Sequence, residues 1–139
     1  MALKNDRLVI DTNLWISFLL SKRLSALDLL FQNSQIELLF SDELMSEFID
    51  VAHRPKFRKY FSKNDLEELI LKIRMHSEFV HVVTNVNICR DLKDNFLISL
   101  AKDGKASHII TGDTDLLVLK SFERIKILTF SDYIKKYKG

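Results

Sequence analysis

Short apolar runs, most of them β-branched, alternate along the chain with segments whose apolar residues recur at helical spacing. The runs lie at residues 8–10, 36–40, 79–83, 107–111 and 125–129. The first of them, residues 8–10, is apolar at consecutive positions, which is typical of a strand buried on both faces. Strands that alternate with helices within one domain form a parallel sheet with helices on both faces, joined by right-handed crossovers. The pattern therefore predicts the α/β class.

Cap residues and apolar stripes place helices between these strands. Ser41 and Ser131 stand where N-caps are expected, and Gly104 lies near an expected C-cap. The predicted helices span residues 14–20, a segment that begins near Ser25 and includes Leu27, a segment that Ser41 begins and Pro55 ends, residues 62–74, 94–105 and 116–120, and a final segment from Ser131.

The composition is that of an ordinary globular domain. The chain has 139 residues, 47% of them hydrophobic and 29% charged, so we expect one domain over residues 1–139 with a sizeable core. No apolar run approaches the roughly 18 residues that span a bilayer, and the first residues lack the apolar core of a signal peptide. Because the single Cys89 cannot form an internal disulfide, a cytoplasmic location is expected.

Acidic side chains follow several of the predicted strands. Asp11 comes directly after the first strand, and Asp113 and Asp115 come after the fourth. Asp94 falls in the first turn of the helix after the third strand, and Glu47 lies at the border of the polar face of the helix after the second. Sites in open parallel sheets form outside the carboxyl ends of the strands. These acids are therefore expected on one rim, although N-capping or a favourable helix dipole explains each of them singly.

Clustered carboxylates indicate a divalent cation. They raise one another's pKa unless a positive charge neutralises them. Ligands that are all oxygen, without Cys or His, suit Mg²⁺ or Mn²⁺ better than zinc. The four histidines show no ligand spacing, and we interpret them as structural or surface residues.

Basic residues are concentrated in two stretches, although the net charge of +2 is small. Residues 54–60 and 135–138 combine lysine and, in the first stretch, arginine with aromatic side chains. Such stretches can hold phosphates by charge and bases by stacking. A solvated helix face or a frayed tail accounts for the same composition, so both interpretations stay open.

Four segments, in this order and spacing, resemble the PIN-domain ribonucleases, in particular the branch of toxin components of bacterial and archaeal toxin–antitoxin systems. The resemblance covers nearly the whole chain. The segments are residues 9–13 (VIDTN), 41–47 (SDELMSE) followed by 54–57 (RPKF), 89–97 (CRDLKDNFL) and 110–117 (ITGDTDLL). That branch usually has proline after the position of Asp91, where this chain has Leu92.

The resemblance implies a three-layer α/β/α sandwich around a parallel sheet of about five strands. It also implies an endonuclease, dependent on Mg²⁺ or Mn²⁺, that cleaves single-stranded RNA with a metal-activated water and leaves 5′-phosphate and 3′-hydroxyl ends. The catalytic, metal-binding acids of the family fall on Asp11, Glu47, Asp94 and Asp113.

Further positions match supporting roles in the family. Asp91 and Asp115 fall on positions that are often acidic and support the metal, and Asn13 and Thr111 fall on polar positions that orient ligands or water. We expect Thr111 and Gly112 to make a turn that points Asp113 inward, and Asp115 to cap the next helix. From charge alone, the side chains expected to bind the RNA backbone are those of Arg54, Lys56, Arg58 and Lys93.

Two other kinds of protein fit parts of this pattern. A receiver-type signalling module also binds Mg²⁺ on a parallel sheet, but it needs a lysine after the last strand, where this chain has Thr129, Phe130 and Ser131. A protein-binding module would use its apolar helices to hold an antitoxin peptide or a second copy of the chain, and the sequence does not locate that surface.

Overall fold

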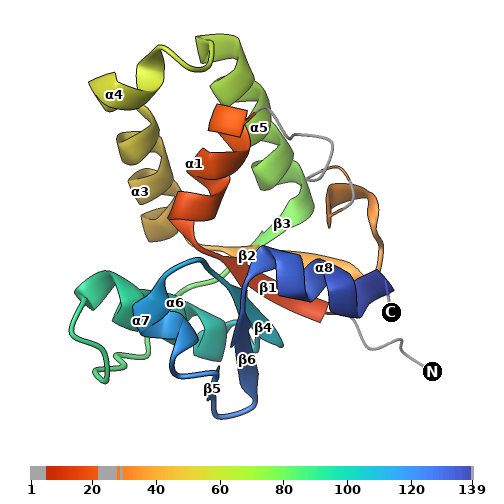
Figure 1. Ribbon diagram of the computed structural model, residues 1–139, viewed down its shortest axis with the longest axis vertical. Coiled ribbons are helices and arrows are strands. Elements are labelled where there is room, and N and C mark those ends of the chain that lie inside the picture. Colours follow the sequence, from red (N-terminus) through yellow and green to blue (C-terminus); the bar gives the residue numbers. More distant parts are fainter. Residues whose placement is uncertain (1–5, 22–27, 29, 139) are drawn as a thin grey trace.

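A sheet of six strands forms the centre of the computed structural model, which describes residues 6–21, 28 and 30–138 (Figure 1). The strands lie in the order β3-β2-β1-β4-β6-β5. All neighbours are parallel except β5, which pairs antiparallel with β6. The strands are β1 (Asp6–Ile10), β2 (Ile36–Phe40), β3 (Ser77–Phe79), β4 (His108–Ile110), β5 (Ser121–Phe122) and β6 (Ile125–Leu128).

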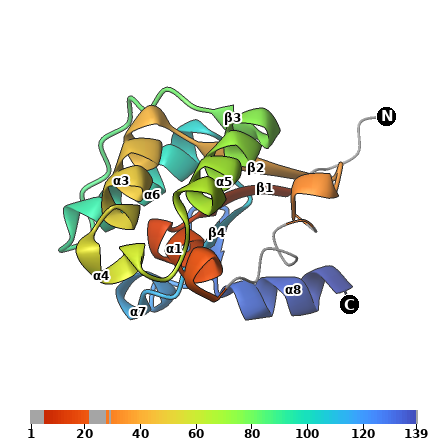
Figure 2. The same ribbon diagram turned by 90° about the horizontal axis from the view of Figure 1, so that it is seen from above.

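Helices cover both faces of this sheet. Figure 2 shows α1 and α8 on one side and α6 on the other, and α6 contacts both β1 and β4. The predicted α/β/α sandwich with a mainly parallel sheet is therefore confirmed. The helices are α1 (Thr12–Ser21), α3 (Asp42–Ala52), α4 (Pro55–Arg58), α5 (Lys63–His76), α6 (Leu92–Asp103), α7 (Thr114–Leu117) and α8 (Phe130–Lys138).

Aromatic packing fixes α1 against the sheet. Trp15 is fully buried, and its ring centroid lies 5.6 Å from that of Phe40 on β2 and 6.1 Å from that of Phe18. Phe18 in turn meets Phe130 of α8 edge-on at 5.2 Å. Such aromatic pairs add about 0.5–1.5 kcal/mol each to the burial of their surfaces. The start of α1, and with it the residue that follows β1, is held in a fixed position.

The third strand differs from its prediction over residues 79–83. It spans Ser77–Phe79, and the chain then leaves the sheet to run along α6. The physical reason is a competition for backbone donors, because side chains of α6 accept hydrogen bonds that a further strand would otherwise use. The Asp103 carboxylate accepts from the amides of Val83 and Thr84, and Ser99 accepts from Val86 N at 2.9 Å.

Most of the predicted helices are present, with shifted ends. Ser41 and Ser62 cap α3 and α5 as N-caps, and Gly104 is the C-cap of α6. The prediction that Ser131 is an N-cap is wrong, because α8 begins at Phe130 and the hydroxyl of Thr129 accepts a hydrogen bond from Asp132 N. The helix predicted near Ser25 and Leu27 begins outside the described residues, and the two-residue strand β5 was not predicted because it is too short to show a pattern.

None of the helices in the described part of the chain combines the length and apolar composition that a membrane crossing needs.

Candidate metal centre

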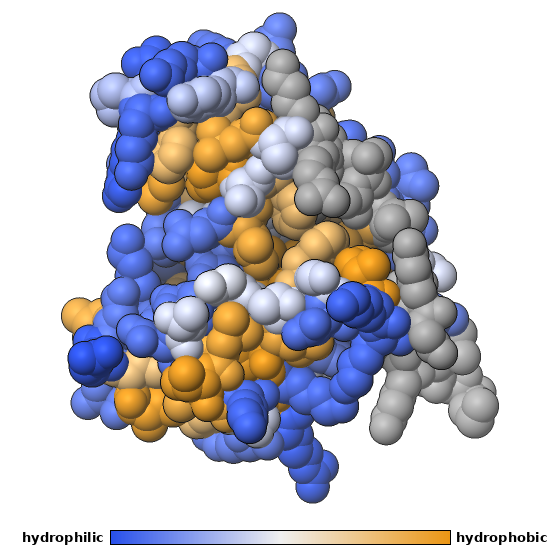
Figure 3. Space-filling model, in the orientation of Figure 1, coloured by the Kyte–Doolittle hydropathy of each residue, from blue (hydrophilic) through white to orange (hydrophobic). Residues whose placement is uncertain are grey.

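The acids predicted from the strand ends meet at one pocket of about 140 Å³. Asp11 follows β1, Asp94 lies in the first turn of α6, and Asp113 precedes α7. In Figure 3 a hollow separates the part that contains α3 and α4 from the part that contains α6 and α7, and mostly hydrophilic residues surround it. The carboxylates that line the pocket are those of Asp11, Glu47, Asp91, Asp94 and Asp113.

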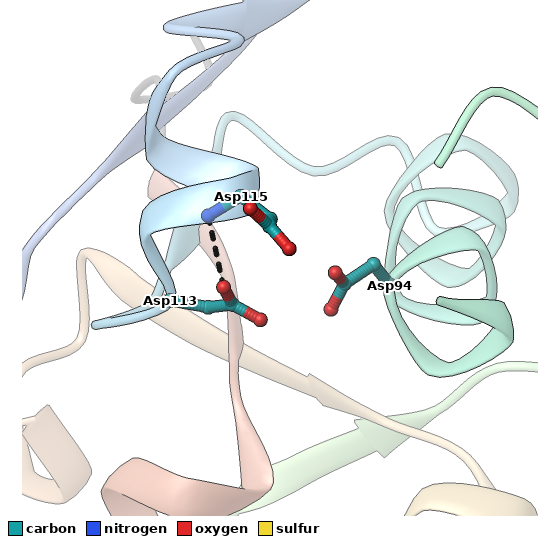
Figure 4. Close-up of side chains that lie close together, drawn as sticks. All are labelled: Asp94, Asp113 and Asp115. Atoms are coloured by element: carbon teal, nitrogen blue, oxygen red, sulfur yellow. Dashed lines mark hydrogen bonds between the residues drawn. The ribbon is translucent and has the colours of Figure 1, made fainter. Parts of the chain in front are cut away.

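Three carboxylates approach one another most closely. Asp94, Asp113 and Asp115 each offer an oxygen, and these oxygens all lie within 4.8 Å of one another. Figure 4 shows Asp94 reaching from α6 toward the two acids at the start of α7. Asp94 is buried, Asp113 half-buried and Asp115 exposed, so the cluster opens toward solvent through Asp115. The predicted acids Asp11 and Glu47 line the same pocket but are not members of this cluster.

A hydrogen-bonded turn positions Asp11 and Asp113. The buried Thr111 hydroxyl donates to Asp11 Oδ2 at 2.8 Å and accepts from Asp113 N at 3.0 Å. It therefore ties the end of β4 to the acid that follows β1. Thr111 and Gly112 were together expected to make this turn, but the φ of Gly112 is not positive and a Cβ there would meet nothing within 4 Å. The hydroxyl of Thr111, not the small size of Gly112, determines the turn.

The capping roles of the acids also differ from the expectation. Asp113 is the N-cap of α7, because its Oδ1 accepts from Asp115 N at 2.9 Å, so the expectation that Asp115 is the cap was wrong. Asp115 lies in the first turn and faces the Arg90 guanidinium at 3.8 Å. Asp91 is the N-cap of α6 through Lys93 N, which places the start of that helix at Leu92, two residues before the predicted start.

Burial and mutual repulsion raise the pKa of two of the acids. The pKa of Asp94 rises from 3.8 to about 6, first because the side chain is buried and then because Asp113 is close. The pKa of Asp11 is also raised, again mainly by burial, although the hydrogen bond from Thr111 lowers it in part. Both carboxylates are therefore poised to gain from a nearby positive charge.

The residues present fit a divalent cation. Asp94 Oδ2 is buried and accepts no hydrogen bond from any residue that the structure describes. An orphaned buried carboxylate oxygen is costly unless a ligand satisfies it. The donors around it are carboxylate oxygens, which suit hard cations such as Mg²⁺ and Mn²⁺.

Basic side chains line the same pocket as the acids. Arg54, Lys56 and Lys93 line it together with the ring of Phe57, and Lys93 Nζ lies 3.5 Å from Glu47 Oε1. Arg58 does not line this pocket and lies instead at a separate cavity. Asn13, predicted as a supporting residue, lines the pocket with an exposed side chain.

Sequence reasoning missed one polar residue of the pocket. Thr12 is 3% exposed, lines the pocket, and its hydroxyl has no hydrogen-bond partner among the described residues. Its position between two predicted site residues, Asp11 and Asn13, could have indicated a role in the pocket. A threonine at the start of a helix is equally typical of a purely structural residue, so the sequence alone did not favour that role.

A mainly parallel α/β sheet with an acidic, cation-suited pocket at the carboxyl ends of its strands defines the class of this protein. Residues 7–115 match the family described as PIN domain, so the chain belongs to the PIN domain family. It is also 34% identical to the uncharacterized protein MJ1680 of Methanocaldococcus jannaschii, over 94% of this chain and 91% of that protein. PIN domains are generally nucleases and typically bind divalent metals.

Proposed function

We propose that the chain is an endoribonuclease that uses Mg²⁺ or Mn²⁺ to cleave single-stranded RNA, and that it is the toxin component of a toxin–antitoxin pair. The observation that carries the nuclease proposal is the buried, unpartnered Asp94 Oδ2 within a cluster of three carboxylates, in a chain of the PIN domain family. Family membership supports nuclease chemistry, whereas RNA as substrate and the toxin role rest on the resemblance of the four sequence segments.

In this proposal the acids of the site and Thr111 have different roles. Asp94, Asp113 and Asp115 hold the cation, and Asp11 and Glu47 stand at the same pocket to complete its ligands or orient water. When bound, a divalent ion lowers the pKa of a water molecule and neutralises negative charge on a phosphodiester. Thr111 keeps Asp11 and Asp113 at a fixed separation by its two hydrogen bonds. Preorganisation of this kind lowers the cost of assembling the site during the reaction.

The basic residues of the pocket suit an RNA strand. Arg54, Lys56 and Lys93 place positive charge beside the acids, where the phosphates that flank the scissile bond would lie. Phe57 adds a ring on which an unpaired base can stack, and stacking favours single strands because bases of a duplex are already stacked. Lys93 is paired with Glu47 in the free protein, so binding of a phosphate would compete with that ion pair.

A cleavage assay with matched variants tests this function. Purified protein is incubated with a 5′-labelled single-stranded RNA in Mn²⁺, in Mg²⁺ and in EDTA. We expect cleavage only with a cation, products with 5′-phosphate and 3′-hydroxyl ends, and a loss of about 100-fold or more in Asp94→Asn and Asp113→Asn, because metal binding contributes several kcal/mol to the transition state.

The control is Glu43→Gln, which removes an exposed acid from α3 outside the pocket and should cleave like the wild type. If Asp94→Asn cleaves as fast as the wild type, a contaminating nuclease is the cause and the proposal fails. Cleavage of DNA at an equal rate would contradict RNA as the substrate class.

The toxin role needs a test in cells. Induced expression of the wild type should arrest growth, Asp94→Asn should not, and co-expression of the neighbouring reading frame should restore growth if it encodes an antitoxin. Light scattering after size-exclusion chromatography tests the predicted homodimer, and a monomer at high concentration would contradict it.

The receiver-type alternative has no support in the fold. Doubly wound receiver-like sheets follow the order 2-1-3-4-5, with the third strand inside the sheet, whereas β3 is an edge strand here.

A further inference from the structure

A second basic site lies beyond α4, away from the acids. A cavity of about 290 Å³ is enclosed by the end of α3, the short α4 and the beginning of α5. Its polar rim carries three basic residues, His53, Arg58 and Lys63, and no acidic residue lines it. Its apolar part is formed by Ala52, Phe61 and Leu66.

The charges of this cavity are available to a ligand. Arg58 is exposed; its backbone N–H donates to Arg54 O, but its guanidinium makes no hydrogen bond or ion pair with any described residue. Lys63 has one exposed partner, Glu67, at the long distance of 3.9 Å. His53 Nδ1 donates to Ile49 O at 2.8 Å, which leaves Nε2 as the ring nitrogen for a ligand.

Two features of the local sequence are unfavourable for a purely structural role. Lys63 is the first residue of α5, where a positive charge opposes the helix dipole. Phe61 is only half-buried beside this charge, although a phenylalanine gains most when it is fully buried. Positive charge around a partly exposed aromatic ring is the arrangement that holds a phosphate and stacks a base in single-strand binding proteins.

The cavity is close to the acidic pocket along the chain. α4 separates the two, since Arg54, Lys56 and Phe57 line the acidic pocket while His53 and Arg58 line the second cavity. The helix has only four residues, so one RNA strand can reach from one site to the other. Figure 1 shows α4 joining α3 to α5 at one end of the molecule, so a strand that leaves the acidic pocket over α4 would reach the cavity.

We propose that this cavity is a binding site for a flanking nucleotide of the single-stranded RNA substrate, in which Arg58 and Lys63 contact a phosphate and Phe61 stacks on a base. The inference rests on the proposed ribonuclease function, whose substrate strand it extends past the cleavage site. It predicts that affinity depends on RNA length, because a trinucleotide held at the acids is too short to fill both sites.

Fluorescence anisotropy in EDTA tests the site without cleavage. The probes are labelled oligouridylates of 3 and 12 nucleotides, and the variant is Arg58→Gln/Lys63→Gln. Each neutralised phosphate adds about 0.7 to the slope of log affinity against log salt for single strands, so the loss of the one phosphate that Arg58 and Lys63 share should reduce that slope by about 0.7 for the 12-mer. We expect roughly 3- to 30-fold weaker binding of the 12-mer and unchanged binding of the 3-mer.

A matched control removes two exposed lysines that line neither cavity, one on α6 and one on β6, in Lys102→Gln/Lys126→Gln. Phe61→Leu keeps an apolar side chain without the ring and should weaken binding of the 12-mer about fivefold or more. An unchanged salt slope in Arg58→Gln/Lys63→Gln, an equal loss in the control, or no binding of the wild type to the 12-mer would overturn the inference. RNA that binds with the expected slopes but stays uncleaved in Mn²⁺ contradicts the proposed function and still supports this site.

Discussion

Neutralising Asp94 should stabilise the metal-free protein, although Asp94 is a proposed metal ligand. The side chain is 4% exposed, and its pKa is raised from 3.8 to about 6 by burial and by the charge of Asp113. One pKa unit corresponds to about 1.36 kcal/mol, so a rise from 3.8 to about 6 means that ionised Asp94 destabilises the native state by about 3 kcal/mol.

The pH range of this effect follows from the direction of the shift. The folded-state pKa is above the unfolded one, so the penalty is absent below a pH of about 4, grows as the pH rises toward 6 and is complete above 6. Asp94→Asn removes the penalty but also an acid from the first turn of α6, which costs about 0.3–1 kcal/mol. The net gain at pH 7.5 is about 2 kcal/mol, which corresponds to a Tm higher by roughly 4 to 8 °C.

Thermal unfolding followed by circular dichroism measures this prediction. Wild type, Asp94→Asn and the control Glu43→Gln are melted in EDTA at pH 4 and pH 7.5, and again at pH 7.5 with MnCl₂. We expect Asp94→Asn to exceed the wild type at pH 7.5 but not at pH 4. Mn²⁺ should raise the Tm of the wild type by binding to the native state, and raise that of the variant less.

Two results would refute the reasoning. One is a lower Tm of Asp94→Asn than of the wild type at pH 7.5 in EDTA, since Asp94 would then stabilise the fold as an ordinary structural residue. The other is an equal Mn²⁺ response in wild type and variant, which would remove Asp94 from the metal site.

Three further predictions concern hydrogen bonds at and near the pocket. Thr111→Val should lower the free energy of unfolding by about 1.5–3 kcal/mol in urea titrations, because Asp11 loses a charged hydrogen bond. Asn95→Ala should lower the free energy of unfolding by about 2–3 kcal/mol and speed hydrogen exchange at Ile88 and Cys89, because the backbone amides of these two residues donate hydrogen bonds to Asn95 Oδ1. Thr12→Val should reduce RNA cleavage while Thr12→Ser retains it, if the unpartnered Thr12 hydroxyl contacts substrate or water, and equal rates would assign it a structural role.

Much of the fold could be predicted because local pattern and tertiary structure agree. Residues 8–10 are apolar at consecutive positions and residues 36–40 are apolar except for Glu37; the two segments form neighbouring strands inside the sheet, and serine caps mark the starts of α3 and α5. The prediction of the third strand failed because of contacts with residues far away in the sequence. Its β-branched residues favour a strand, but acceptors on α6, more than ten residues later in the chain, bind the amides of Val83 and Val86 instead.

The candidate site could be predicted as a set of residues but not as an arrangement. Parallel strands bring their carboxyl ends to one edge, which is why Asp11 and Asp113 were expected on the same rim. The distances among the acids depend on side-chain rotamers and on the turn made by Thr111, neither of which has a sequence signature. Arg58 shows the same limit, because it lines a different cavity from Arg54 although the two residues are close in the sequence.

Capping explains some of the acids better than others. Capping accounts for Asp91 and Asp113, whose carboxylates accept amide hydrogen bonds at the starts of α6 and α7. It does not account for Asp94, because a favourable helix dipole of about 0.3–1 kcal/mol is smaller than the cost implied by a pKa of about 6. A buried Asn or Ser at that position would avoid this cost. The buried, unpartnered Oδ2 of Asp94 therefore supports the proposed cation site, because a divalent cation would both offset the repulsion from Asp113 and satisfy this oxygen.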